Sequence, residues 1–387
     1  MWYFVSPQVV FGEGALCALE EIEGRSALIV TDANLVSLGM VERVKTHLKQ
    51  AGIQAHVYDA VEPDPCVETV QEGVKIALET QPDWIIGLGG GSPMDVAKAV
   101  WVLYERPDLQ LGEINPIVHL GLRKKARLIT IPTTSGTGAE ATWAIVITDK
   151  EEGRKMGLGN RENAADLAIV DPSLAEGMPP ELTADTGLDA LTHAVEGYTC
   201  TWHTDLTDGM CIQAARLVFS YLPQAVADGS NMEARERMHN AAVCAGLGFG
   251  NAMASAAHAM GHVLGAVFHL SHGRAVGICL PYTIEFAAKE APDRFVELGA
   301  ILGERSEGGE AGARRLAGRV RELCKEIGMP TSLAEAGIER DAFQANRDKL
   351  VEDAFNDTQM LTAVRCPTYD QLGKLFSSVY DGIPVDF

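Results

Sequence analysis

Short apolar runs alternate with helical patterns over the first part of the chain. Apolar runs that predict buried strands lie at residues 27–30, 53–58, 84–86, 127–131, 144–147 and 167–170. The segments that show the residue spacing of helices are 35–49, 67–78 and 99–104. Alternation of this kind indicates a parallel sheet covered by helices. We therefore expect an α/β domain with a Rossmann-like parallel sheet over residues 1–180.

The pattern changes after Pro172. Strand signals nearly disappear, and long stretches rich in Ala, Leu, Met and Glu continue to the end of the chain. Stretches of this length without strand signals predict helices. We therefore expect an all-helical domain over residues 181–387, and two domains suit a chain of 387 residues.

Composition and charge exclude several classes of partner. The formal net charge is −21, because 53 acidic residues face only 32 basic ones. Such a surface repels nucleic acid and anionic membranes. The sequence shows no basic signal-peptide region and no apolar run long enough to span a bilayer. The eight cysteines form no CxxC pair, which in a large acidic chain predicts reduced thiols in a cytoplasmic protein and argues against a cysteine-based zinc site.

A glycine-rich loop follows the strand predicted at residues 84–86. Three consecutive glycines let the backbone approach a ligand closely, and the helix that begins here offers free N–H groups to a diphosphate. We interpret Ser92 as the N-cap, Pro93 as the first helical residue, and Asp95 as part of a pair resembling a capping box. A tight strand-to-helix turn would explain one or two glycines, whereas three followed by Ser-Pro favour a ligand. The residues expected to contact a nucleotide are Gly89, Gly90, Gly91, Ser92 and Asp95.

Two further segments complete a candidate nucleotide site. The segment 132–140, PTTSGTGAE, again follows a predicted strand, and its hydroxyls and glycines suit a nucleotide. Its candidate contacts are Thr133, Thr134 and Thr137. Two such loops at the ends of strands in one sheet are what a dinucleotide site needs. Asp32 follows the strand at 27–30, where its carboxylate suits an adenosine ribose and would repel a 2′-phosphate; a helix N-cap is an equally good interpretation.

Polar side chains cluster in otherwise apolar helices of the second domain. Asp189 and His193 are four residues apart, so they share a helix face. An isolated pair could form a mutual hydrogen bond without a metal. However, His258 and His262 repeat this spacing in another apolar helix, and His272 follows in surroundings rich in Gly and Ala. One aspartate with three imidazoles is a suitable ligand set for Fe(II) or Zn(II), so we predict a divalent metal site.

Four motifs, in this order, resemble those of the iron-containing (group III) alcohol dehydrogenase family. They are GLGGGSPMDVAKA, IPTTSGTGAEAT, TGLDALTHAVEGY and SAAHAMGHVLGAVFHLSHG, and the resemblance covers nearly the whole chain. It implies a dehydroquinate synthase-like architecture, with a nucleotide-binding domain followed by a helical one. Carried over motif by motif, it assigns the metal ligands to Asp189, His193, His258 and His272. It also implies that His262 is a catalytic residue beside the nicotinamide, and that Asp32, in a Val-Thr-Asp motif, faces the adenosine ribose.

The resemblance implies hydride transfer between NAD and a small alcohol/aldehyde pair. It favours Fe(II) over Zn(II), a homodimer or higher homo-oligomer, and His262 as a candidate proton carrier. Where the family often has Asn-Pro-Arg, residues 363–368 read AVRCPT, so the substrate is left open. The alternatives are zinc-dependent polyol oxidation, as in glycerol dehydrogenase, a lyase like dehydroquinate synthase on the same fold, and a nucleotide sensor without catalysis. A sensor would keep the glycine loops but would not need four converging ligands.

Overall fold

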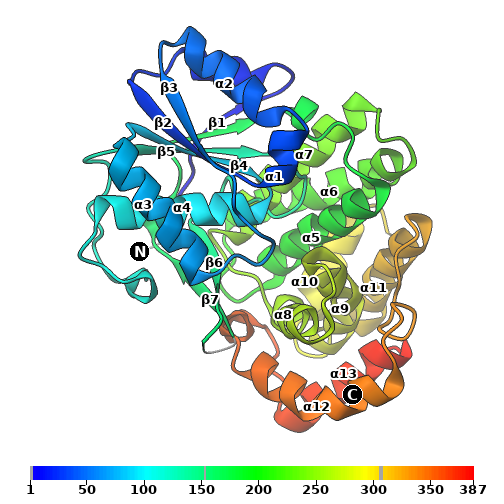
Figure 1. The fold of residues 1–387 in the computed structure, drawn as a ribbon. Coiled ribbons are helices and arrows are strands. Elements are labelled where there is room, and N and C mark those ends of the chain that lie inside the picture. Colours follow the sequence, from blue (N-terminus) through cyan, green and yellow to red (C-terminus); the bar gives the residue numbers. More distant parts are fainter. Residues whose placement is uncertain (1–2, 152–153, 305–307) are drawn as a thin grey trace. The chain divides into compact units, whose positions relative to one another are not determined.

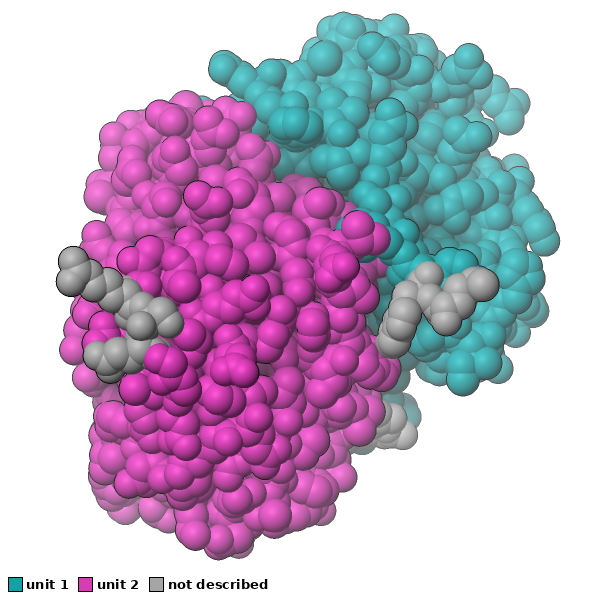
Figure 2. Space-filling model, turned by 180° about the vertical axis from the view of Figure 1, so that it is seen from behind, with its two compact units in different colours: residues 1–176 teal, residues 177–387 magenta. Residues whose placement is uncertain are grey.

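The chain divides into two compact units, residues 1–176 and residues 177–387 (Figure 2). The computed structural model describes residues 3–151, 154–304 and 308–387. Each unit has its own buried apolar core. The sequence places the division after residue 180, close to the start of the first helix of the second unit.

Unit 1 is built on a six-stranded sheet with the order β1-β8-β5-β4-β2-β3. Figure 1 labels most of these strands. Its strands are β1 (Gln8–Phe11), β2 (Ser26–Val30), β3 (Gln54–Tyr58), β4 (Trp84–Gly89), β5 (Arg127–Pro132) and β8 (Leu167–Val170). All pairings in this sheet are parallel, as predicted. Along β2, Ala27 and Ile29 join one core while Leu28 and Val30 join the other. Both faces of the sheet are therefore buried, which explains why its strands appear as continuous apolar runs.

Helices cover both faces of this sheet. The helical segments of unit 1 are η1 (Ala15–Glu20), α1 (Ala33–Ser37), α2 (Met40–Gln50), α3 (Val67–Thr80), α4 (Gly91–Glu105), η2 (Leu111–Glu113), η3 (Arg161–Asn163) and η4 (Pro172–Leu174). Apolar residues of α3 and α4 fill one core, and those of η1, α1 and α2 fill the other. The single helix predicted over 35–49 is divided at Leu38 and Gly39 into α1 and α2.

One predicted strand does not join the parallel sheet. β6 (Ala144–Asp149) pairs antiparallel with β7 (Arg154–Gly159) in a separate two-stranded sheet. In β6, Ile145 and Ile147 are fully buried, whereas Val146 between them is exposed. Alternation of this kind is typical of a strand with one covered face. The apolar run therefore predicted a strand correctly, but its assignment to the parallel sheet was wrong.

Unit 2 contains helices and no strand in its described residues, as predicted. Its helical segments are α5 (Pro180–Thr199), α6 (Asp205–Ala227), α7 (Met232–Phe249), α8 (Ala256–Phe268), α9 (His272–Ala287), α10 (Pro292–Ile301), α11 (Gly309–Glu326), α12 (Arg340–Phe355), η5 (Thr358–Thr362) and α13 (Tyr369–Asp381). α5 packs against α6, α7 and α9, and nearly all its residues beyond the first turn are buried. Polar side chains on α5 therefore lie inside the core. None of the described helices is long and apolar enough to cross a membrane.

Candidate metal centre and nucleotide loops

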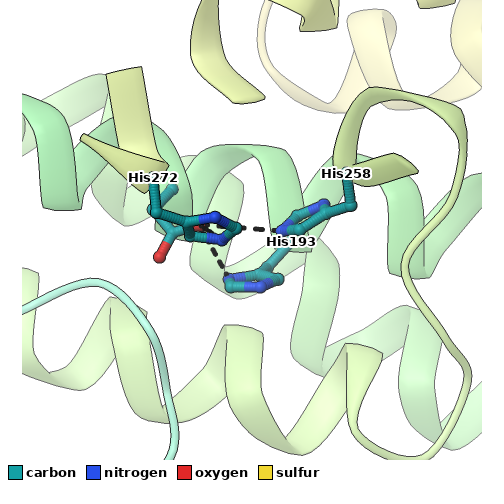
Figure 3. A group of neighbouring side chains, drawn as sticks. His193, His258 and His272 are labelled. Atoms are coloured by element: carbon teal, nitrogen blue, oxygen red, sulfur yellow. Dashed lines mark ion pairs between the residues drawn. The ribbon is translucent and has the colours of Figure 1, made fainter. Parts of the chain in front are cut away.

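Four side chains of unit 2 converge inside its helical core (Figure 3). Asp189 and His193 come from α5, His258 from α8, and His272 is the first residue of α9. The distances from Asp189 Oδ1 are 3.6 Å to His193 Nδ1, 3.7 Å to His258 Nε2 and 3.4 Å to His272 Nε2. One ligand atom from each residue lies within 4.8 Å of the others. Ligands bound at about 2.1 Å to a tetrahedral ion stand about 3.4 Å apart, so the group has the dimensions of a site for one metal ion.

Three of these ligand atoms are buried without a hydrogen-bond partner. They are Asp189 Oδ1, His193 Nδ1 and His258 Nε2. Asp189 Oδ1 and His193 Nδ1 are 3.6 Å apart, which is too far for the mutual hydrogen bond that would explain this pair without a metal. A buried polar atom without a partner costs about 1–3 kcal/mol. A single cation bound between the ligands would satisfy all three atoms.

The charges around the group also fit a divalent cation. Asp189 and Glu196 are buried carboxylates, 2% and 4% exposed. Burial favours a higher pKa for Asp189, but His193, His272 and His258 outweigh it, and the pKa is lowered. Burial and the neighbouring imidazoles lower the pKa of His193 to about 3, whereas at His258 the two carboxylates outweigh burial and raise the pKa to about 9. One imidazolium would balance one carboxylate, but a divalent ion would balance both.

Glu196 was not predicted from the sequence. Its carboxylate accepts hydrogen bonds from His258 Nδ1 at 2.6 Å and from the backbone N–H groups of Ser255 at 2.9 Å and Ala257 at 2.6 Å. It therefore fixes the start of α8 and holds His258 with Nε2 free for a metal. Asp189, His193 and Glu196 stand at positions i, i+4 and i+7 of one helix, and this shared face was a usable signal.

Replacing Glu196 with glutamine is expected to raise the dissociation constant for the divalent ion about 10- to 100-fold. Glutamine has the same shape but cannot accept all three hydrogen bonds, so His258 loses its fixed orientation. Zn(II) titration of apoprotein against a chelator measures the change. Glu285→Gln is the matched control, because Glu285 is equally buried at 3% exposure but pairs with Arg321. An equal loss of affinity in both variants would show that Glu196 acts through general stability.

Close packing sets the positions of the other ligands. Gly273 lets the start of α9 approach α5, since a side chain there would place its β-carbon 2.0 Å from the carbonyl oxygen of Asp185. His272 is thereby held next to Asp189. The ring of Phe249 stacks on His193, with centroids 3.8 Å apart and planes 9° apart. Gly273 thus brings the start of α9 against α5, and Phe249 fixes the ring plane of His193.

His262 lies beside the four ligands but outside the group. Its Nδ1 is 2.8 Å from Asp357 Oδ2, and Asp357 precedes η5. Its ring centroid is 6.0 Å from that of His258 and 5.4 Å from that of His272. The His262 side chain is 23% exposed, compared with 4% for His258. The repeated spacing therefore puts both histidines on one face of α8, but only His258 contributes an atom to the group.

The candidate nucleotide loops follow β2, β4 and β5, which are neighbours in the sheet of unit 1. Because these strands are parallel, the loops lie along one edge of the sheet. Side chains at Gly90 and Gly91 would place β-carbons 3.4 Å from Thr134 Oγ1 and 3.2 Å from Thr137 Cγ2. In addition, the Thr133 N–H donates to the carbonyl of Gly89 at 3.0 Å. The loops therefore pack against each other at the N-terminus of α4.

The capping details at α4 differ from the prediction. The helix begins at Gly91 with Gly90 as N-cap, so Ser92 and Pro93 are its second and third residues. Asp95 makes no capping pair; its buried carboxylate accepts from Val146 N at 3.0 Å and lies 3.4 Å from Lys98 Nζ. The Lys98 side chain is fully buried and needs an opposite charge nearby. This tertiary requirement outweighs the local capping preference.

Asp32 is the N-cap of α1. Its Oδ1 accepts hydrogen bonds from Asn34 N at 2.9 Å and Leu35 N at 3.1 Å. The N-cap interpretation is therefore correct. Both bonds use Oδ1, and the side chain is half-buried, so the cap does not engage Oδ2. Capping and ribose binding are thus compatible at this residue.

Comparisons with known proteins agree along the whole chain. Residues 6–172 match the family described as iron-containing alcohol dehydrogenase, and residues 183–380 match the Fe-containing alcohol dehydrogenase family, C-terminal. The chain is 40% identical over 390 residues to the NADPH-dependent butanol dehydrogenase of Clostridium saccharobutylicum, covering 100% of both. It is 33% identical over 384 residues to the NAD-dependent methanol dehydrogenase of Bacillus methanolicus, covering 97% of this chain and 99% of that one. The solved structure of the alcohol dehydrogenase from Oenococcus oeni gives a TM-score of 0.93 at 31% identity, covering 98% of this chain and 100% of that one.

Proposed function

This chain belongs to the iron-containing alcohol dehydrogenase family, and we propose that Asp189, His193, His258 and His272 hold its metal ion. The protein is a metal-dependent oxidoreductase that acts on an alcohol/aldehyde pair with a nicotinamide cofactor. The observation that carries the proposed ligand set is the convergence of four ligand atoms, three of them buried without a partner. We propose Fe(II) as the ion, with Zn(II) as the alternative that this ligand set also accepts.

The residues around the metal centre have different roles in the proposed reaction. When bound, the ion supplies Lewis acidity to the substrate oxygen. Asp189, His193 and His258 are buried and keep water from one side of the centre, whereas the His272 side chain is 36% exposed. We propose that a small alcohol or aldehyde approaches from the side of His272. His262, also partly exposed, then carries a proton between the substrate oxygen and solvent.

Unit 1 supplies the nucleotide site in this proposal. The N–H groups at the start of α4, from Gly90 to Ser92, bind the diphosphate, which suits a chain whose acidic residues outnumber its basic ones. Thr133, Thr134 and Thr137 line the nucleotide from the second loop. The carboxylate of Asp95 is hydrogen-bonded to Lys98 and to Val146 N. We therefore propose that Asp95 stabilises the glycine-rich loop and does not contact the nucleotide through its carboxylate. Asp32 binds the adenosine ribose and favours NAD over NADP.

Replacing Asp32 with glycine is expected to lower the preference for NAD over NADP at least about tenfold, which corresponds to about 1.4 kcal/mol. The carboxylate that repels a 2′-phosphate would be gone, while glycine is tolerated as an N-cap at a cost of a few tenths of a kcal/mol. The ratio of kcat/KM with the two cofactors measures the change. The butanol dehydrogenase relative is NADPH-dependent and the methanol dehydrogenase relative is NAD-dependent, so the preference for NAD proposed here depends on Asp32 itself. Equal wild-type rates with both cofactors at matched low concentration would contradict it.

The proposed function is tested by metal analysis of anaerobically purified protein together with NADH oxidation over a panel of aldehydes. One equivalent of iron with turnover of simple aldehydes is the expected result. One equivalent of zinc with selective polyol oxidation would favour the alternative like glycerol dehydrogenase. Protein that binds NAD but contains no metal and turns over no substrate would contradict the proposed metal chemistry.

A homodimer or higher homo-oligomer and a cytoplasmic location are further proposals for this chain. The first rests on the family resemblance alone. The second rests on the acidic composition and on cysteines that are all free thiols in the structure, each lying among the described residues. Analytical ultracentrifugation measures the oligomeric state directly.

A further inference from the structure

Asp357 joins two elements that lie far apart in the sequence. It is the N-cap of η5, where its Oδ1 accepts a hydrogen bond from Gln359 N at 2.8 Å. Its Oδ2 is 2.8 Å from Nδ1 of His262 on α8, 95 residues away. One carboxylate oxygen is thus anchored to the backbone while the other meets the imidazole. The hydrogen bond to Gln359 N therefore fixes the orientation of the Asp357 carboxylate, and with it the position of Oδ2 beside His262 Nδ1.

The hydrogen bond has a chemical consequence for His262. An ionised carboxylate only accepts hydrogen bonds, so the imidazole nitrogen that faces it must carry a proton. Burial favours a higher pKa for Asp357, but the hydrogen bonds from His262 and from the backbone N–H of Gln359, together with the neighbouring imidazoles, outweigh it, and the pKa is lowered. The neutral imidazole therefore carries its proton on Nδ1 and leaves Nε2 without one.

His262 lies beside the proposed metal centre, where the unprotonated nitrogen of this tautomer could accept a proton. Its ring lies nearly parallel to that of the proposed ligand His272, with centroids 5.4 Å apart and planes 22° apart. Nδ1 is bonded to Asp357, so Nε2 is the nitrogen left to exchange a proton with a substrate. A base must accept a proton through an unprotonated nitrogen.

We propose that Asp357 is a positioning residue that holds His262 as the Nδ1–H tautomer, with Nε2 ready to take the proton of the alcohol. This inference rests on the proposed function, because it gives His262 a role only if His262 acts on the substrate. Asp357 sets both the orientation of the imidazole and the nitrogen that carries its proton. Asp357 does not itself touch the substrate.

The substitution Asp357→Asn tests this directly. Asparagine keeps the size of aspartate, and its oxygen can still accept from Gln359 N, so the cap is retained. Its NH₂ group, however, faces His262 and can only donate, which requires Nδ1 without a proton and moves the proton to Nε2. A purely structural role would leave this variant close to wild type, whereas a positioning role would not.

Two measurements distinguish these roles. The ¹⁵N chemical shifts of the His262 ring in Zn(II)-loaded protein, assigned by their loss in His262→Ala, report the tautomer without any turnover. We expect a change from Nδ1–H to Nε2–H, and a fall in kcat of at least about 100-fold with unchanged metal content and NAD affinity. The control is Asp228→Asn, the same substitution at a turn. There Asp228 Oδ1 accepts hydrogen bonds from the backbone and side chain of Ser230. This variant should behave as wild type.

The possible failures are separable. An unchanged tautomer with unchanged kcat in Asp357→Asn would overturn the positioning role. A changed tautomer with unchanged kcat would instead overturn the proton-carrying role of His262 in the proposed function, and with it the catalytic part of this inference. Loss of metal in Asp357→Asn would show that Asp357 supports the metal ligands, and this would also overturn the positioning role.

Discussion

Replacing His272 with alanine is expected to remove the bound metal ion and the turnover together. His272 supplies one of the four atoms that lie within 4.8 Å of one another, and alanine offers no ligand in its place. The Lewis acid contributes several kcal/mol to the transition state, and about 1.4 kcal/mol corresponds to tenfold in rate. We therefore expect kcat/KM to fall at least about 1,000-fold. Metal content per chain after dialysis and steady-state kinetics measure the two losses.

The fold should survive this substitution. His272 is the most exposed of the four ligands and stands at the start of α9, so alanine leaves no buried cavity. Unit 1 has cores of its own, so NAD affinity should be retained. The control is His269→Asn, which removes an exposed imidazole three residues away; His269 has a φ of 56°, a conformation that asparagine tolerates. Full metal occupancy in His272→Ala would remove His272 from the ligand set.

The sequence predicted most of the parallel sheet because its strands are buried on both faces. A run such as Ala27–Val30 is apolar at every position, and this signal needs no knowledge of its neighbours. β7 was missed because its sequence, RKMGLG, combines two charges with two glycines and has no apolar run. Its existence depends on pairing with β6, which is a tertiary contact. The misassignment of β6 has the same cause.

The candidate site shows the same division between local and distant signals. The pairs Asp189/His193 and His258/His262 were visible because four-residue spacing places side chains on one helix face. Glu196 carries an equivalent local signal, because it lies seven residues after Asp189 on the same helix face. Asp357 carried none, because its contact with His262 spans 95 residues and joins α8 to the segment after α12. The capping pair predicted for Asp95 was wrong because this carboxylate pairs with Lys98, whose charge is satisfied only in the folded unit.

Replacing His262 with alanine is expected to leave the metal in place while lowering kcat at least about 100-fold, the usual effect of losing a general acid–base group. Its Nδ1 is bonded to Asp357, and its ring lies outside the group of ligand atoms, so no ligand is removed. A fifth protein ligand would also fill the open position that a substrate oxygen needs. Metal analysis, NAD titration and the pH profile of kcat are the measurements. Loss of metal as complete as in His258→Ala would show that the ligand assignment is wrong, whereas unchanged metal and rate would make His262 structural.

A double variant extends this test to the pair. If Asp357 affects the reaction only through His262, then adding Asp357→Asn to His262→Ala should lower kcat no further, because the group that Asp357 orients is already absent. Two independent effects would instead multiply, since changes at uncoupled sites add as free energies. We therefore expect the double variant to match His262→Ala within about a factor of two, which corresponds to about 0.4 kcal/mol. A further fall of 100-fold in the double variant would mean that Asp357 serves the reaction by a route that does not pass through His262.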